Sequence, residues 1–147
     1  MDIINIKGLI LTPLKQINNP KGKILHAIKK DDDGFISFGE VYFSTVNQNQ
    51  IKGWNKHMKM TLNLVVPVGK VLFIIHDSNN SKNSNFFEIY LSQDNYQRLT
   101  IPPNLWIAFK GIDKEPNLIM NLSNLEHDPD ELVKKDLNEI DYDWSIR

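Results

Sequence analysis

Short apolar runs rich in β-branched and aromatic residues, each followed by turn-forming residues, succeed one another along most of this chain. They cover residues 41–46, 62–68, 71–75, 86–91, 96–101 and 118–122. Runs of this length and composition favour strands, and their fairly regular spacing is typical of a sandwich or barrel. We therefore predict an all-β fold, with helical structure confined to one turn in the tail at 129–135.

The junction between two of these runs has the form of a tight turn. Residues 62–68 and 71–75 are separated by Gly69 and Lys70 alone. A two-residue connection that contains glycine is typical of a β-hairpin. The sequence therefore predicts that these two strands pair with each other.

Length and composition limit the classes of protein to consider. The 147 residues suit one domain, 1–147, because no repeat or domain boundary is visible. A net charge of −1 argues against a nucleic-acid surface, and the lack of cysteine excludes disulfides and thiolate chemistry. No apolar run reaches the roughly 18 residues of a membrane span, and the N-terminus lacks a signal-peptide pattern. We expect a cytoplasmic protein without membrane or nucleic-acid partners.

Several segments in a fixed order carry a family resemblance. They are Lys52-Gly53-Trp54, residues 63–71, residues 91–96, Ile101-Pro102-Pro103 and the ending 139–144. In this order, from about Phe38 onward, the chain resembles the dTDP-4-dehydrorhamnose 3,5-epimerases of the cupin superfamily. The resemblance implies a cupin-type jelly-roll β-barrel or sandwich with a short C-terminal helical tail. It also implies a ligand site inside the cup and a homodimer in which strands cross between subunits.

The resemblance implies proton abstraction next to a sugar ketone, but the positions of the catalytic histidines are changed. The base histidine of the family corresponds to Asn55, and a second histidine corresponds to Ile107. The arginine before the glycine is Lys52, and the family tyrosine that acts as acid aligns near His127. An amide does not accept a proton near neutral pH, so Asn55 cannot replace the base.

The remaining residues offer a relocated set of proton-transfer groups. His57 lies two residues after Asn55, so a regular strand places both side chains on one face. We consider His57 as base, Lys59 or Lys110 as enolate stabiliser, and His127 as acid, since imidazole exchanges protons near neutral pH. The alternative is that both histidines are rim or structural side chains.

Residues for binding a nucleotide sugar are better preserved than those for catalysis. Glu40, Tyr42 and Ser44 alternate along one strand face, where related epimerases place sugar and base contacts. We add Lys52 and Asn55 from the motif. Further candidates are Arg98 and Lys110 for the diphosphate, and Trp54 and Trp106 for stacking. Trp54 could equally belong to the core, and Glu40 could pair with a surface lysine.

The pattern for a metal cupin is incomplete. Such proteins carry a His-x-His pair, a carboxylate and a later histidine, whereas here the corresponding residues are Asn55, His57, Thr61 and Ile107. One ligand is too few for a typical site. We expect neither metal nor cofactor.

Two functions therefore stay open. One is an epimerase-like isomerase that acts on a 4-keto-6-deoxy nucleotide sugar in surface polysaccharide biosynthesis. The other is a catalytically silent cupin that binds a nucleotide sugar or a glycan precursor.

Overall fold

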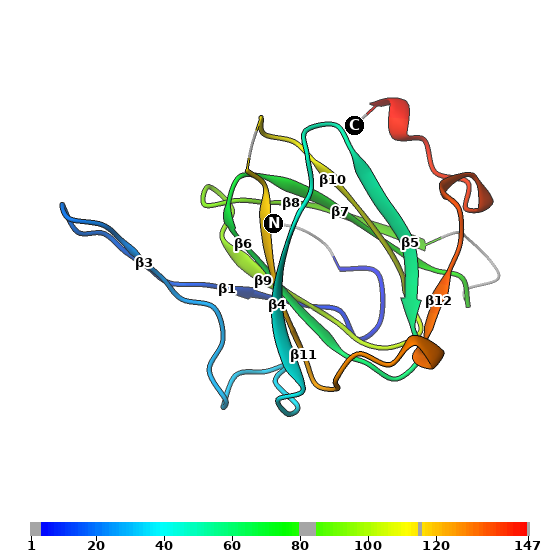
Figure 1. The fold of residues 1–147 in the computed structure, drawn as a ribbon, viewed down its shortest axis with the longest axis horizontal. Coiled ribbons are helices and arrows are strands. Elements are labelled where there is room, and N and C mark those ends of the chain that lie inside the picture. The colour runs from blue at the N-terminus through cyan, green and yellow to red at the C-terminus, as the bar shows by residue number, and fades with distance from the viewer. Residues whose placement is uncertain (1–3, 80–84, 115, 147) are drawn as a thin grey trace.

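Two five-stranded antiparallel sheets face each other in the computed structural model, which describes residues 4–79, 85–114 and 116–146 (Figure 1). The first sheet has the order β1 (Ile10–Pro13), β9 (Gln97–Ile101), β6 (Leu62–Val68), β11 (Leu118–Ser123) and β4 (Glu40–Thr45). The second has the order β12 (Leu132–Lys134), β5 (Ile51–His57), β10 (Trp106–Gly111), β7 (Val71–Asp77) and β8 (Asn85–Leu91). This is the jelly roll that the sequence predicted.

Two segments lie outside the sandwich. A short hairpin of β2 (Gln16–Ile17) and β3 (Ile24–Leu25) extends away from the sheets as an arm (Figure 1). The C-terminal segment runs along the outer side of the second sheet. None of the helical segments in the described ranges has the length and apolar character that a membrane-spanning helix requires.

The tail contains the helical turn that the sequence predicted within 129–135, but it is a short 3-10 turn that leads into a strand. A single 3-10 turn at Pro129–Glu131 ends at β12, which pairs with the end of β5. The Asp128 side chain caps this turn by accepting a hydrogen bond from the Asp130 amide. Two further 3-10 turns, at Leu137–Glu139 and Trp144–Ile146, complete the helical content of the described tail.

The second sheet is buried on both faces, which explains the unbroken apolar run of β7. Val71, Phe73 and Ile75 point into the core between the sheets. Leu72 and Ile74 alternate with them and pack on the other side, in a cluster with Trp54, Trp106 and Ile140. A strand covered on both faces needs apolar residues at every position rather than at every second one.

The prediction that 62–68 and 71–75 form a hairpin is wrong. β6 pairs with β9 and β11 in the first sheet, whereas β7 pairs with β8 and β10 in the second. Gly69, at a φ of 84°, therefore turns the chain from one sheet to the other. A Cβ there would lie 2.4 Å from the Pro116 carbonyl oxygen, so the close approach at this corner requires glycine.

Candidate active site

A cavity of about 210 Å³ opens between the two sheets. Its wall combines aliphatic and aromatic side chains with a few polar ones, the usual composition of a small-molecule site. The lining residues are Tyr42, Ser44, Lys52, Asn55, His57, Leu62, Leu64, Phe73, Ile107, Phe109, Ile119 and Asn121.

An irregularity in β5 brings three polar side chains of this strand into the cavity. In a regular strand Lys52 and Asn55, three residues apart, would point to opposite faces. Pairing with β10 shifts register here, because Asn55 lies opposite Ile107 and Gly53 lies opposite Ala108. The extra residue, Trp54, turns to the outer face, and Lys52, Asn55 and His57 all line the cavity.

The sequence Lys-Gly-Trp needs its glycine at this point. Gly53 has a φ of 150°, and a Cβ there would lie 2.5 Å from the Cβ of Ala108. Trp54 is fully buried on the outer face, against the aromatic side chains of the C-terminal segment. Gly53 and Trp54 thus set the shape of the strand, whereas Lys52 and Asn55 on either side of them face the cavity.

The opposite wall of the cavity comes from the first sheet. Tyr42 and Ser44 point inward from β4, the last strand of this sheet. Asn121 lies directly opposite Tyr42 on β11, and its Nδ2 donates a hydrogen bond of 2.8 Å to the Tyr42 hydroxyl. A ligand in the cavity therefore lies between His57 and Asn55 on one sheet and this polar pair on the other.

His57 is held by a buried carboxylate. Its Nδ1 lies 2.7 Å from Oε2 of Glu131, whose side chain is 3% exposed. The other carboxylate oxygen, Oε1, accepts hydrogen bonds from the backbone amides of Lys59 and Met60, at 3.1 and 2.9 Å. Register places Glu131 here, because it directly precedes β12 and Leu132 pairs with His57.

The electrostatics of this pair fix which nitrogen of His57 can act as a base. Burial alone would raise the pKa of Glu131, but the hydrogen bonds from His57, Lys59 and Met60 outweigh it and lower that pKa below its usual value. An ionised carboxylate can only accept hydrogen bonds, so Nδ1 of His57 carries the proton. In the neutral imidazole Nε2 is then the nitrogen without a proton, and it is the one that can accept a proton as a general base.

The structure brings five of the predicted site residues to this cavity and leaves the predicted acid outside it. Tyr42, Ser44, Lys52, Asn55 and His57 line the cavity. The Lys52 ammonium donates a hydrogen bond of 2.6 Å to the Thr45 carbonyl, which spans the gap between β5 and β4. His127 is exposed and is not among the lining residues.

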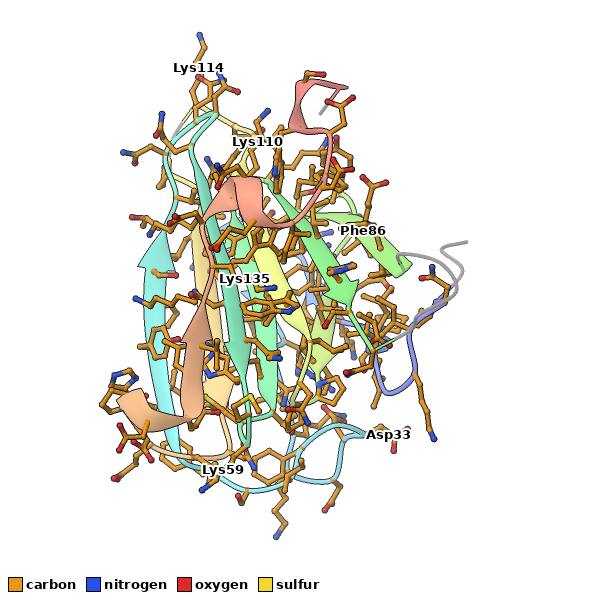
Figure 2. All side chains as sticks on the ribbon, turned by 90° about the vertical axis from the view of Figure 1, so that its right-hand side faces the viewer. Asp33, Lys59, Phe86, Lys110, Lys114 and Lys135 are labelled. Atoms are coloured by element: carbon orange, nitrogen blue, oxygen red, sulfur yellow. The ribbon has the colours of Figure 1, made fainter. Side chains whose placement is uncertain are left out.

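The two lysines considered as enolate stabilisers also lie elsewhere. β5 ends at His57, and the chain bends at Lys59, whose side chain is exposed. Lys110 follows Phe109, which faces the cavity, and so belongs to the other side of β10. Figure 2 shows Lys59 and Lys110 at opposite ends of the strands. Lys59 would share the strand face of His57 only if β5 continued to it, and the bend ends β5 first.

Three further predicted contacts are set apart from the cavity. Glu40, at the start of β4, does not line it. Trp106 is buried on the outer face of the second sheet, where the ammonium groups of Lys56 and Lys135 lie 4.9 and 4.8 Å from its ring centre. Trp54 belongs to the same outer cluster. The Lys135 side of the sheet faces the viewer in Figure 2.

Arg98, predicted as a diphosphate contact, is fully buried in a polar network outside the cavity. It donates hydrogen bonds to Asn63 and Thr12, and to the carbonyls of Ala27 and Asp33. It also forms an ion pair of 3.3 Å with Asp32. These contacts hold the segment between β3 and β4 against the first sheet.

Sequence reasoning missed Glu131 and Asn121. Glu131 lies 74 residues from His57, and nothing local to it indicates a partner. Asn121 did carry a signal, because it is a polar residue on the same strand face as Ile119 within the apolar run of β11. A polar residue on a buried face is unusual and indicates either a hydrogen-bonding network or a site.

Two other observations bear on the choice of site. No group of three or more His, Asp or Glu side chains with the arrangement of a metal site occurs in the described ranges. A second cavity, of about 260 Å³, lies under the arm and is lined by Thr12, Pro13, Leu14, Lys15, His26, Ala27, Ile28, Lys29 and Asp32. It contains a histidine without a carboxylate hydrogen bond among the described contacts, so the cavity between the sheets is the better candidate for proton transfer.

Comparison with known proteins places the chain in a family. The model of the FdtA family, described as WxcM-like, C-terminal, matches residues 7–141. The chain belongs to the FdtA family. Its resemblance to the epimerase-like cupins, inferred from sequence motifs, is confirmed by this match and by the structures that it resembles.

Three of the proteins that match over most of the chain are named as sugar or glycan isomerases or epimerases. A dTDP sugar isomerase from Desulfovibrio desulfuricans G20 is 31% identical, with a TM-score of 0.88, over 95% of this chain and 92% of that protein. The probable low-salt glycan biosynthesis epimerase Agl13 of Haloferax volcanii is 24% identical over 96% of both chains. The dTDP-4-dehydrorhamnose 3,5-epimerase of Sulfolobus tokodaii, 18% identical, shares the fold with a TM-score of 0.82, over 99% of this chain and 86% of that protein.

Proposed function

We propose that this FdtA-family protein is a nucleotide-sugar isomerase of glycan or polysaccharide biosynthesis, which removes a proton next to the ketone of a 4-keto-6-deoxy nucleotide sugar. The observation that carries the proposal is the hydrogen bond between His57 and the buried, ionised Glu131 inside the cavity. A histidine held in one tautomer by a carboxylate is the arrangement that a general base needs. Family membership and the dTDP sugar isomerase relative support the substrate class.

The chemistry can be written for the residues present. Nε2 of His57 takes the proton from the carbon next to the ketone, and the electron pair of the broken C–H bond forms the enolate, with the charge on the ketone oxygen. Glu131 stabilises the imidazolium that forms, because its carboxylate accepts the Nδ1 hydrogen bond. Asn55 lies beside His57 on the same strand face and can donate its amide hydrogens to substrate oxygens.

The number of histidines favours one of two outcomes for the enolate. Among the described residues that line the cavity, His57 is the only histidine. A single base that moves the proton from C3 to C4 on the same face, while the proton of the C3 hydroxyl passes to the C4 oxygen, moves the ketone from C4 to C3, a 3,4-keto isomerisation. Inversion at C3 or C5, as in a 3,5-epimerase, requires a second acid on the opposite face, where the cavity offers the Tyr42 hydroxyl. We favour the keto isomerisation, with epimerisation as the second candidate.

A catalytically silent binding cupin is the remaining alternative. It would not need a buried carboxylate that holds one histidine tautomer, because desolvating a charged pair costs free energy. The His57–Glu131 pair therefore argues for a reaction rather than for binding alone.

Proton NMR of TDP-4-keto-6-deoxyglucose in deuterated water, with the purified protein, tests the proposal. We expect the C3 or C5 proton signal to disappear, and the product spectrum to distinguish a moved ketone from an inverted centre. The variant His57→Gln should lower the exchange rate about 10²- to 10⁴-fold, the usual contribution of a general base. His26→Gln, a histidine outside this cavity, is the matched control and should exchange at the wild-type rate.

Two results would contradict the proposal. If the wild-type protein causes no exchange but broadens the ligand signals, and TDP reverses the broadening, the protein is a binding cupin. If His57→Gln exchanges as fast as wild type, His57 is not the base.

The variant His127→Gln decides the acid role predicted for that residue, and its exposed position leads us to expect unchanged product formation.

We also propose a homodimer, as the resemblance implied. β4 is the last strand of its sheet, and Val41, Tyr42 and Phe43 on it are 41%, 44% and 62% exposed. An exposed apolar edge strand is commonly covered by a second chain, and the arm of β2 and β3 could supply further contacts. Light scattering coupled to size-exclusion chromatography measures the mass directly, and a monomer at micromolar concentration would contradict this proposal.

A further inference from the structure

Asn121 has a buried hydrogen-bond acceptor without a partner. Its side chain lines the cavity from the middle of β11, and the residue is 5% exposed. Nδ2 donates to the Tyr42 hydroxyl at 2.8 Å, but Oδ1 has no hydrogen-bond partner within the described part of the chain. Buried side-chain oxygens are nearly always paired, so an unpaired one that faces a ligand cavity indicates a contact made by the ligand.

Tyr42 completes a pair of complementary groups. Its hydroxyl oxygen accepts the hydrogen bond from Asn121, so its own proton is still available to donate. The described residues supply no acceptor for that proton. Since the two residues lie directly opposite each other on neighbouring strands, the cavity wall presents one donor and one acceptor side by side.

This arrangement selects among the parts of a nucleotide sugar. Phosphate oxygens only accept hydrogen bonds and would meet the acceptor Oδ1 unfavourably, so the diphosphate does not fit. A ketone with a hydroxyl on the neighbouring carbon fits both groups, because the carbonyl accepts from Tyr42 and the hydroxyl donates to Asn121. The sugar ring must also reach His57, which lines the same cavity from the opposite sheet.

We propose that Asn121 is a specificity-determining residue, which with Tyr42 recognises the hydroxyl next to the ketone of the substrate. The inference rests on the proposed function for the identity of the ligand, and it names the substrate class more narrowly. The protein takes 4-keto sugars that keep the C3 hydroxyl and discriminates against their 3-deoxy counterparts. A site built to pair with a hydroxyl rejects an analogue that lacks it, because its own polar group is then left unpaired.

A comparison of two proteins and three ligands tests this inference. Dissociation constants of wild type and Asn121→Leu are measured by calorimetry for TDP-4-keto-6-deoxyglucose, for its 3-deoxy analogue and for TDP. Leucine has a similar volume and suits the neighbours Leu64 and Ile119, but accepts no hydrogen bond. We expect the variant to bind the hydroxylated ligand about tenfold more weakly, and the other two ligands within twofold of wild type, since one hydrogen bond accounts for a change of this order.

Stability of the variant separates a binding role from a structural one. Leucine removes the unpaired buried Oδ1 together with the hydrogen bond from Nδ2 to the Tyr42 hydroxyl, and these two effects oppose each other. The melting temperature should therefore change little, whereas a large decrease would indicate a structural role. If the leucine variant does not fold, Tyr42→Phe with the same ligands takes its place. This variant should weaken binding of the keto sugar about tenfold and leave binding of TDP unchanged.

The outcomes distinguish failure of the inference from failure of the proposed function. Equal weakening for all three ligands, including TDP, would mean that Asn121 contacts the base or supports the fold, and would overturn the inference. Unchanged binding of the hydroxylated ligand would do the same. If wild type binds the keto sugar with the expected Asn121 dependence but exchanges no proton, the inference stands and the proposed reaction fails. If wild type binds neither sugar ligand, both are overturned.

Discussion

His57 and Glu131, 74 residues apart in the chain, meet in a hydrogen bond of 2.7 Å at the point where β12 joins the end of β5. The carboxylate is itself fixed by two backbone amides of the bend that follows His57. Because one bend supplies donors to Glu131 and ends the strand that carries His57, base and carboxylate are positioned by the same backbone. Such double positioning is expected of a group whose orientation matters for a reaction.

Glu131→Gln should reduce turnover at least about 100-fold with little change in KM, because an amide no longer holds Nδ1 of His57 as the protonated nitrogen. The control is Glu126→Gln, an exposed acidic residue of the same stretch, which should keep full activity. Nitrogen-15 NMR of the histidine ring gives a readout that a structural role would not change. We expect one Nδ1-protonated tautomer in wild type and a mixture in Glu131→Gln.

Stability in acid should depend on the same carboxylate. The pKa of Glu131 is lowered in the folded protein, so its ionised form contributes stability above the unfolded value of 4.5 and loses that contribution as the pH falls through the folded pKa. The free energy of unfolding of wild type should therefore exceed that of Glu131→Gln at pH 6, and this difference should decrease towards pH 3.

Urea unfolding of both proteins at pH 6, 5, 4 and 3 measures this difference. Asp32 also has a lowered pKa, mainly through a hydrogen bond from the backbone of Lys29, and so adds a loss of stability in acid. That loss is common to both proteins and cancels in the difference. A difference that stays constant with pH would show that the pKa of Glu131 is the same in the folded and the unfolded protein.

Most strands could be predicted from local sequence, because their residues alternate or are wholly apolar over short runs. The expected strand 118–122 is Leu118–Ser123 in the structure, and 86–91 is Asn85–Leu91. Which strands pair is not a local property. Gly69 and Lys70 have the sequence of a hairpin turn, yet they cross between sheets, because β6 pairs with β9 and β11 in one sheet and β7 with β8 and β10 in the other. The turn at Pro129 likewise leads directly into a strand, because the next residues form β12 and pair with the edge of β5.

The candidate site was predictable where its residues follow strand alternation, as on β4 and β5, or stand in the family motif, as Lys52 does. Asn55 and His57 share a face by alternation, and they line the cavity together. Lys59 does not, since the strand ends before it. Arg98 illustrates a different limit, because a charged residue on a strand gives no sign of whether it faces a ligand or a buried network.

Gly53→Ala tests whether the irregularity of β5 builds the cavity. The new Cβ would meet Ala108 at 2.5 Å, and φ is 150°, so we expect a loss of about 2–4 kcal/mol in the free energy of unfolding. Binding of TDP-sugars measured by calorimetry should be weakened with it. Gly22→Ala is the matched control, because Gly22 has a φ of 137° but nothing within 4 Å of its Cβ position. It should cost only about 1 kcal/mol and leave binding intact. Equal effects of the two variants would mean that the contact with Ala108 is unimportant.

Arg98→Met distinguishes a structural arginine from a diphosphate ligand. The guanidinium is fully buried and joins Asp32 to several backbone carbonyls, so its removal should lower the free energy of unfolding by about 3 kcal/mol or more. Because Arg98 lies outside the cavity, the folded variant should bind TDP within twofold of wild type. Lys30→Met, an exposed neighbour of the same network, controls for loss of charge. A variant of normal stability that no longer binds TDP would instead assign Arg98 to the diphosphate, the role that its sequence position first suggested.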